Sequence, residues 1–114
     1  MPTYDRGDVI IVLYPFTDGV GRKPRPAVVV SSQVLNNGSP DVIVALITSN
    51  IRGSPGIGDY DLPDWAQYGL LAPSRVRASR VAAVELTKVR KHLGTMSEGD
   101  QKQVDDCLRQ VFGI

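Results

Sequence analysis

The chain has 114 residues, of which 42% are hydrophobic and 22% are charged, and its formal net charge at pH 7 is +1. This length predicts one domain, residues 1–114, large enough to bury a core without disulfides or metals. No apolar run approaches the roughly 20 residues of a membrane-spanning helix, which excludes a helical membrane protein. The first residues lack the apolar segment of a secretory signal, and a single cysteine, Cys107, excludes an internal disulfide. We therefore expect a cytoplasmic protein with no membrane contact.

Three strand-like runs occupy the first half of the chain. Val9–Tyr14 is rich in β-branched and aromatic residues and lies between turn-forming residues. Residues 15–26 follow as a long loop punctuated by glycine and proline. Ala27–Ser32 and Asp41–Thr48 are almost continuously apolar, and the first of them is expected to be a central strand. Residues 36–40 between them predict a turn.

The second half begins with a long irregular segment, residues 49–65, rich in glycine and proline. Loops of this length in compact domains tend to be functional or mobile. Beyond it we expect three further short strands, at Ala66–Leu71, Ser79–Leu86 and Lys88–Leu93.

The C-terminus changes to a helical pattern. Ser97, with Asp100 three residues on, resembles a capping box in which aspartate replaces the usual glutamate or glutamine. The apolar residues that follow recur at helical spacing: Val104, Cys107, Leu108, Val111 and Phe112. The sequence thus predicts a mainly β fold closed by one amphipathic helix of about four turns.

Positive charge is concentrated in two places although the chain is nearly neutral. Arg22, Lys23 and Arg25 form one cluster. Between residues 74 and 91 a single acid accompanies six basic residues: Arg75, Arg77, Arg80, Lys88, Arg90 and Lys91. Alternation would put the first two of these on one strand face. Such segregation suits either a basic binding face or strand edges protected by solvated charge, and both interpretations stay open.

Several kinds of active site find little support. One histidine and one cysteine give no zinc-type spacing. Asp59, Asp61 and Asp64 lack the spacing of a calcium loop, so we expect a solvated acidic loop. His92 has no nucleophilic serine context, and Gly19-Val20-Gly21 lacks the spacing of a nucleotide-binding loop. We therefore predict no metal and no cofactor.

A family resemblance is carried by segments that follow one another along almost the whole chain. The first half contains Gly7–Ile10, Pro15–Asp18, Arg25–Val30 and Ala45–Ser49, and the second half contains Gly69–Arg77 and Leu93–Ser97. In this order the segments resemble the successive signatures of the MazF/PemK toxins of type II toxin–antitoxin systems.

The resemblance implies a small SH3-like or CcdB-like β-barrel with a C-terminal helix, usually a homodimer. It implies metal-independent, sequence-selective cleavage of single-stranded RNA, and inhibition by a cognate antitoxin through an acidic and apolar segment. The family's catalytic arginine falls on Arg25 and its catalytic threonine on Thr48. Relatives usually carry serine, glutamate or lysine in the loop before the arginine, where this chain has Thr17, Asp18, Arg22 and Lys23.

The chemistry of RNA cleavage agrees with these residue types. RNA supplies its own nucleophile, the 2′-OH, so the enzyme must stabilise the phosphorane-like state that its attack creates. The guanidinium of Arg25 offers a donor fork for phosphate oxygens, and Thr48 can donate to the same oxygens. The candidate substrate contacts are Thr17, Arg22, Lys23, Ser49, Arg75 and Arg77.

An alternative stays open at this point. In this alternative, the chain is a non-catalytic β-barrel binding module or a CcdB-like toxin that poisons a protein target such as gyrase. The neutral overall charge and the altered loop before Arg25 motivate it. However, Arg109–Ile114 lacks the tryptophan-bearing ending expected for the gyrase-directed class.

Overall fold

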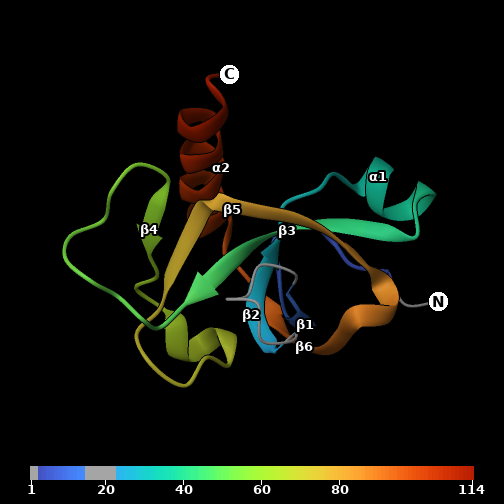
Figure 1. Ribbon diagram of the computed structural model, residues 1–114, viewed down its shortest axis with the longest axis horizontal. Helices are drawn as coiled ribbons and strands as arrows, with labels where there is room; N and C mark the ends of the chain where they lie inside the picture. The colour runs from blue at the N-terminus through green and yellow to red at the C-terminus, as the bar shows by residue number, and fades with distance from the viewer. Residues whose placement is uncertain (1–2, 15–22) are drawn as a thin grey trace.

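The fold is built on one antiparallel sheet, shown in Figure 1. The computed structural model of the chain describes residues 3–14 and 23–114. In that part six strands pair in the order β4-β5-β3-β2-β1-β6. The strands are β1 Asp8–Leu13, β2 Pro24–Val29, β3 Asp41–Thr48, β4 Asp59–Asp61, β5 Arg75–Glu85 and β6 Val89–Thr95. The helices are α1 Gln33–Gly38 and α2 Glu98–Phe112, with 3-10 turns at Trp65–Tyr68 and Leu86–Lys88.

The prediction of a mainly β fold with a C-terminal helix is confirmed. The SH3-like or CcdB-like barrel is not confirmed as a closed structure. In the described residues β4 and β6 form the two edges of the sheet, and no pairing joins them. No helix in these ranges has the length and hydropathy needed to cross a bilayer.

The central strands bury apolar side chains on both of their faces. Val9 and Val28 belong to one apolar cluster, whereas their chain neighbours Ile10 and Val29 belong to another. Because successive strand residues point to opposite faces, the two clusters lie on the two sides of the sheet. Helix α2 covers the first cluster, into which it inserts Val104. This arrangement explains why the strands are apolar along almost their whole length.

Two predictions of local structure are wrong. Residues 66–71 do not form a strand, because Trp65–Tyr68 is a 3-10 turn that Gly69 ends with a left-handed φ of 74°. A short apolar run with a central glycine has no period that distinguishes a strand from a turn. Residues 36–40 are not a simple turn, because residues 36–38 are the last residues of helix α1 and Ser39 is its C-cap. The N-cap Ser32 accepts a hydrogen bond from the Leu35 amide.

Helix α2 begins at the predicted cap. The Ser97 hydroxyl accepts a hydrogen bond from the Asp100 amide at 3.2 Å. The Asp100 carboxylate does not complete a capping box, because it accepts hydrogen bonds from the hydroxyls of Tyr60, at 2.6 Å, and Tyr68. Burial, and then the bond to Asp100, raises the pKa of both tyrosines. One buried carboxylate therefore ties the start of α2 to β4 and to the 3-10 turn.

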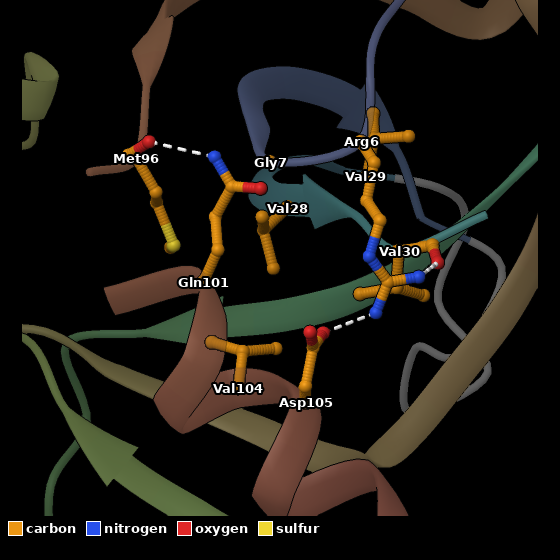
Figure 2. Close-up of a pocket in the computed structure, with 9 residues that line it drawn as sticks. All are labelled: Arg6, Gly7, Val28, Val29, Val30, Met96, Gln101, Val104 and Asp105. Atoms are coloured by element: carbon orange, nitrogen blue, oxygen red, sulfur yellow. Dashed lines mark hydrogen bonds and ion pairs between the residues drawn. The ribbon is translucent and has the colours of Figure 1, made fainter. Parts of the chain in front are cut away.

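A second set of contacts joins α2 to the start of β1 (Figure 2). Gln101 Nε2 donates to the Met96 carbonyl oxygen at 2.8 Å. Gly7 adopts a φ of 95°, and a Cβ there would lie 2.4 Å from Cδ of Gln101, so only glycine fits. Arg6 donates to Asp105 of the helix and to the Val30 carbonyl. These contacts fix the helix against the sheet.

Replacing Asp100 with alanine is expected to lower the free energy of unfolding by about 2–4 kcal/mol, because two tyrosine hydroxyls lose their acceptor. Urea denaturation followed by circular dichroism measures this change. The control is Asp106→Ala, since the Asp106 carboxylate is 56% exposed and, among the described residues, forms its ion pair with Arg109 on the same helix. The control is expected to change stability by less than about 0.5 kcal/mol. Equal effects of the two substitutions would contradict this role of Asp100.

Stability is also expected to fall at alkaline pH because of Tyr14, whose hydroxyl donates to the Arg80 carbonyl. Burial raises the pKa of Tyr14 to about 12, an effect that the positive charge of Arg80 partly opposes. Above pH 10 the unfolded chain loses this proton before the folded chain does. Tyr14 therefore contributes stability that is complete below pH 10 and declines up to about pH 12. Urea midpoints measured from pH 8 to 11 are expected to fall less steeply for Tyr14→Phe; parallel curves would disprove the contribution.

Candidate functional site at the ends of β2 and β3

An open pocket of about 440 Å³ lies where β2 begins and β3 ends. Its polar lining comes from Arg25, Thr48, Ser49, Asn50, Ser74 and Lys91. Its apolar lining comes chiefly from Ile11, Pro26, Ile47, Leu70, Leu71 and Leu93. The pocket therefore combines two cations and several hydroxyl or amide groups with an apolar wall.

Strand register brings Arg25 and Thr48 together. Strands β2 and β3 pair Ala27 with Leu46, and the same register continued by two residues puts Arg25 opposite Thr48. Both residues line the pocket. Arg25 is exposed and forms no ion pair with any described residue. Its guanidinium is therefore available to an anion from solution.

The hydroxyl of Thr48 is oriented by the backbone that follows it. Thr48 Oγ1 accepts a hydrogen bond from the Asn50 amide at 3.1 Å. This contact uses a lone pair of the oxygen and leaves the hydroxyl proton to donate elsewhere. Ser49 and Asn50, both exposed, line the same side of the pocket.

Lys91 is a pocket residue that the sequence did not single out. It is exposed on β6, where it pairs with Ile11, and Ile11 pairs in turn with Pro26 of β2. The basic cluster of residues 74–91 includes Lys91, but its meeting with β2 depends on pairing between the first and last strands. No local pattern carries that information.

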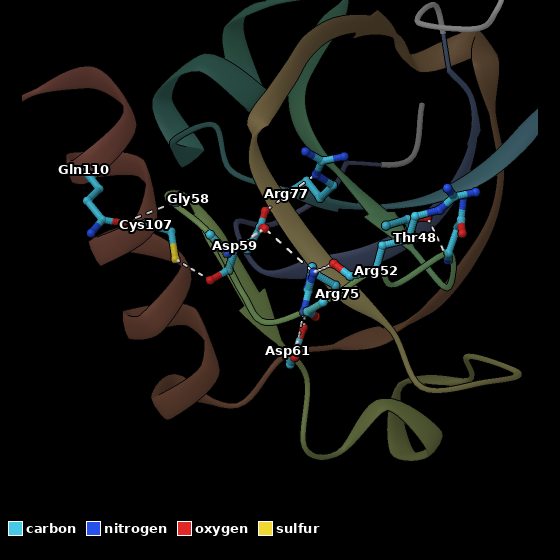
Figure 3. A network of polar contacts seen from close by, with 12 residues as sticks. Thr48, Arg52, Gly58, Asp59, Asp61, Arg75, Arg77, Cys107 and Gln110 are labelled. Carbon is cyan, nitrogen blue, oxygen red and sulfur yellow. Dashed lines mark hydrogen bonds and ion pairs between the residues drawn. The ribbon is translucent and has the colours of Figure 1, made fainter.

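Arg75, by contrast, is a buried side chain in a network of polar contacts (Figure 3). Its Nε donates to Asp61 Oδ1 at 2.5 Å, and Asp59 Oδ2 lies 3.9 Å from its Nη1. The hydrogen bond to Asp61, together with the negative charge of both aspartates, raises the pKa of Arg75 against the opposing effect of burial. Only 5% of its side chain is exposed. The sequence predicted a direct contact between Arg75 and the substrate, but the side chain exposes too little surface to make one.

Arg77 shares a strand face with Arg75, as alternation predicted. Its Nε lies 3.5 Å from Asp59 Oδ1, an ion pair outside hydrogen-bonding geometry that leaves both atoms without another partner in the described residues. The Arg77 side chain remains 39% exposed. The expectation of a solvated acidic loop is wrong in that Asp59 and Asp61 lie on strand β4 and pair with these two arginines, although the Asp61 side chain is still 45% exposed.

The other predicted site residues fall in several places. Lys23 is exposed beside Arg25 at the start of β2. Thr17 and Arg22, like the Gly19-Val20-Gly21 segment, lie outside the described residues. His92 is half-exposed on β6, with Nε2 3.4 Å from Asp8 Oδ1.

The single cysteine carries a structural contact. Cys107 lies on α2 and donates to the Asp59 carbonyl, and burial raises the pKa of its thiol. Among residues 3–14 and 23–114, no three histidine, cysteine, aspartate or glutamate side chains are grouped so that they could hold a metal ion.

Comparison with protein families matches residues 5–112 to the model described as "PemK-like, MazF-like toxin of type II toxin-antitoxin system". Comparison with curated protein sequences gives no match. Among solved structures, MazF from Deinococcus radiodurans is similar at a TM-score of 0.80 and 21% identity, over 100% of both chains.

Two mycobacterial structures are similar as well. An endoribonuclease in complex with its cognate antitoxin has a TM-score of 0.77 and 19% identity, over 97% of this chain and 96% of that one. The Mycobacterium tuberculosis toxin MazF-mt6 has a TM-score of 0.76 and 19% identity, over 94% and 97%. At such identities, the likeness to the three solved structures shows a shared fold.

Proposed function

Because the chain belongs to the PemK-like, MazF-like toxins of type II toxin–antitoxin systems, we propose that it is a metal-independent, sequence-selective endoribonuclease that cleaves single-stranded RNA. The observation that carries the proposal is the pairing of an exposed arginine, Arg25, with the oriented hydroxyl of Thr48 in one open pocket. This pairing favours catalysis over a non-catalytic binding module or a CcdB-like attack on gyrase.

In the proposed reaction the RNA itself provides the nucleophile. The 2′-oxygen forms a bond to the adjacent phosphorus while the bond from phosphorus to the 5′-oxygen breaks, which leaves a 2′,3′-cyclic phosphate and a 5′-hydroxyl. The 2′-OH proton goes to a base, and the leaving 5′-oxygen takes up a proton. Arg25 donates to the non-bridging oxygens as their negative charge grows, and Thr48, on the neighbouring β-strand, donates to the same oxygens. Arginine does not act as the base, since it keeps its proton in proteins.

The rest of the pocket suits single-stranded RNA. Lys91 supplies a second positive charge for a neighbouring phosphate. The apolar wall, which includes Leu70, Leu93 and the 99% exposed Leu71, offers a surface for the face of an unstacked base. We propose direct RNA contacts by Ser49 in the pocket, by the exposed Lys23 near Arg25, and by Arg77, whose side chain is 39% exposed. Thr17 and Arg22, which precede Arg25 in the sequence, remain proposed contacts.

We further propose that the toxin acts as a homodimer in the cytoplasm and that a cognate antitoxin neutralises it. The similar mycobacterial endoribonuclease is in complex with its antitoxin. An acidic and apolar antitoxin segment would suit the cationic surface around Arg25, Lys91 and Arg77. Light scattering of the purified chain tests the dimer. Competition between the antitoxin and labelled RNA tests whether the two share a surface.

The wild-type chain is expected to cleave single-stranded RNA in the presence of EDTA. Arg25→Ala and Thr48→Ala are each expected to lower kcat by roughly 10²–10³, the usual effect of removing one preorganised donor. Thr48→Ser, which keeps the hydroxyl, and Arg109→Ala, which removes an exposed arginine on α2, are the matched controls. An RNA with 2′-deoxyribose at the cleavage position should stay intact. Equal cleavage by all variants, or none by the wild type, would exclude the mechanism.

Lys91→Ala is expected to act on RNA binding and leave the chemical step largely unchanged. If Lys91 contacts one phosphate, the slope of log affinity against log salt for a non-cleavable 2′-deoxy substrate should fall by about 0.7. KM should rise while kcat changes little. Lys102→Ala, at an exposed position of α2, is the control. An unchanged salt slope for Lys91→Ala would remove this lysine from the binding surface.

A further inference from the structure

Arg75 is the one lysine or arginine that is buried among the residues described. It uses several of its donors at once. Nε and Nη2 bind the two carboxylate oxygens of Asp61, at 2.5 and 3.2 Å. Nη2 also donates to the Gly53 carbonyl at 2.9 Å, and Nη1 to the Arg52 carbonyl at 3.4 Å. The guanidinium thus joins β4 and β5 to the segment that leaves β3 (Figure 3).

This segment begins at the pocket. Residues 49–53 follow Thr48 directly, and the register of β3 with β5 places Thr48 opposite Arg75 itself. Ser49 and Asn50 line the pocket, and the Asn50 amide orients the Thr48 hydroxyl. Arg75 therefore lies beside the strand residue at one end of the segment and binds the carbonyls at its other end.

The segment has little else to hold it. In the described part of the chain, the hydrogen bonds that reach residues 52–55 all come from Arg75. An ion pair with Asp61 alone would connect β5 to β4 and leave these residues unattached. The two bonds to backbone carbonyls are the feature that an arginine supplies, because a lysine lacks the planar fork of donors.

We propose that Arg75 is a positioning residue for the pocket: held by Asp61, it fixes residues 49–53 and thereby the Thr48 hydroxyl, without touching RNA. The inference rests on the proposed ribonuclease function, which it deepens. The Arg75 side chain is too buried for a phosphate contact, and its hydrogen bonds orient the backbone that follows Thr48.

The first test uses trypsin and no RNA. Trypsin cleaves after arginine, and the carbonyl of the Arg52–Gly53 bond is one that Arg75 holds. The variants are Arg75→Lys, which keeps the positive charge, and the double variant Arg75→Gln/Asp61→Asn. The double variant is used because the single glutamine substitution would leave the Asp61 carboxylate unpaired and could prevent folding. Fragments 1–52 and 53–114 are expected to form about tenfold faster in both than in the wild type, as local opening becomes easier. Arg109→Gln is the control, and its rate should equal that of the wild type.

The second test measures RNA cleavage and binding by the same four proteins, after circular dichroism has shown that they are folded. Both Arg75 variants are expected to lose about tenfold or more in kcat with KM changed by less than about threefold. The salt slope for a non-cleavable 2′-deoxy substrate should not change. A direct phosphate contact would instead lower that slope by about 0.7 in the double variant and keep it in Arg75→Lys.

The outcomes distinguish the positioning role of Arg75 from the proposed ribonuclease function. An altered salt slope, an unchanged trypsin rate after Arg52, or normal kcat in both variants would overturn the positioning role while leaving the ribonuclease function intact. A wild-type chain that cleaves no RNA would contradict the proposed function, and with it this role of Arg75.

Discussion

Burial of both faces of the central strands is the constraint on which the rest of the structure depends. Because β1, β2 and β3 insert apolar side chains into two clusters, a charged or hydroxyl group within them has no solvent to face. Polar chemistry is therefore confined to the positions where strands enter or leave the core. Arg25, near the start of β2, and Thr48, at the end of β3, occupy two such positions. Antiparallel pairing then brings these ends together, so the same pattern that builds the core also assembles the pocket.

Two arginines on neighbouring strands take different roles because their surroundings differ. Across the sheet, Thr48 is paired with Arg75 of β5, and the register of β2 with β3, continued by two residues, puts Arg25 on its other side. Arg75 has Asp61 beside it and is buried, and its Nε, Nη1 and Nη2 atoms all donate to acceptors within the protein. Arg25 has no acidic partner among the described residues and stays exposed. A guanidinium without a partner attracts an anion, whereas one with a complete set of acceptors orders the chain around it.

The sequence was informative where local periodicity decides the structure. It predicted β1, β3 and α2 closely, including the Ser97 cap, because apolar spacing and capping chemistry act over a few residues. It predicted Arg25 and Thr48 as a pair through the family resemblance.

Features that depend on distant pairing were missed. Arg75 is buried because β4 pairs with β5 and places Asp61 beside it. Lys91 reaches the pocket because the first and last strands, β1 and β6, pair with each other. A cluster of basic residues does not reveal which of its members has an internal partner. Composition and spacing alone therefore grouped Arg75 with the exposed cations.

The long segment between β3 and β4 is held at both of its ends, and this gives it a defined role. Arg75 binds its first part, while its last part is attached to α2: the Gly58 amide donates to Gln110 at 3.2 Å, and Cys107 donates to the Asp59 carbonyl. Gly58 has a φ of 81°, and a Cβ there would lie 2.6 Å from Val111, so the approach of the helix requires glycine. Residues 52–57 are exposed to solvent, whereas Gly58, where the helix is attached, is buried. The helix therefore fixes the far end of the same segment whose near end follows Thr48.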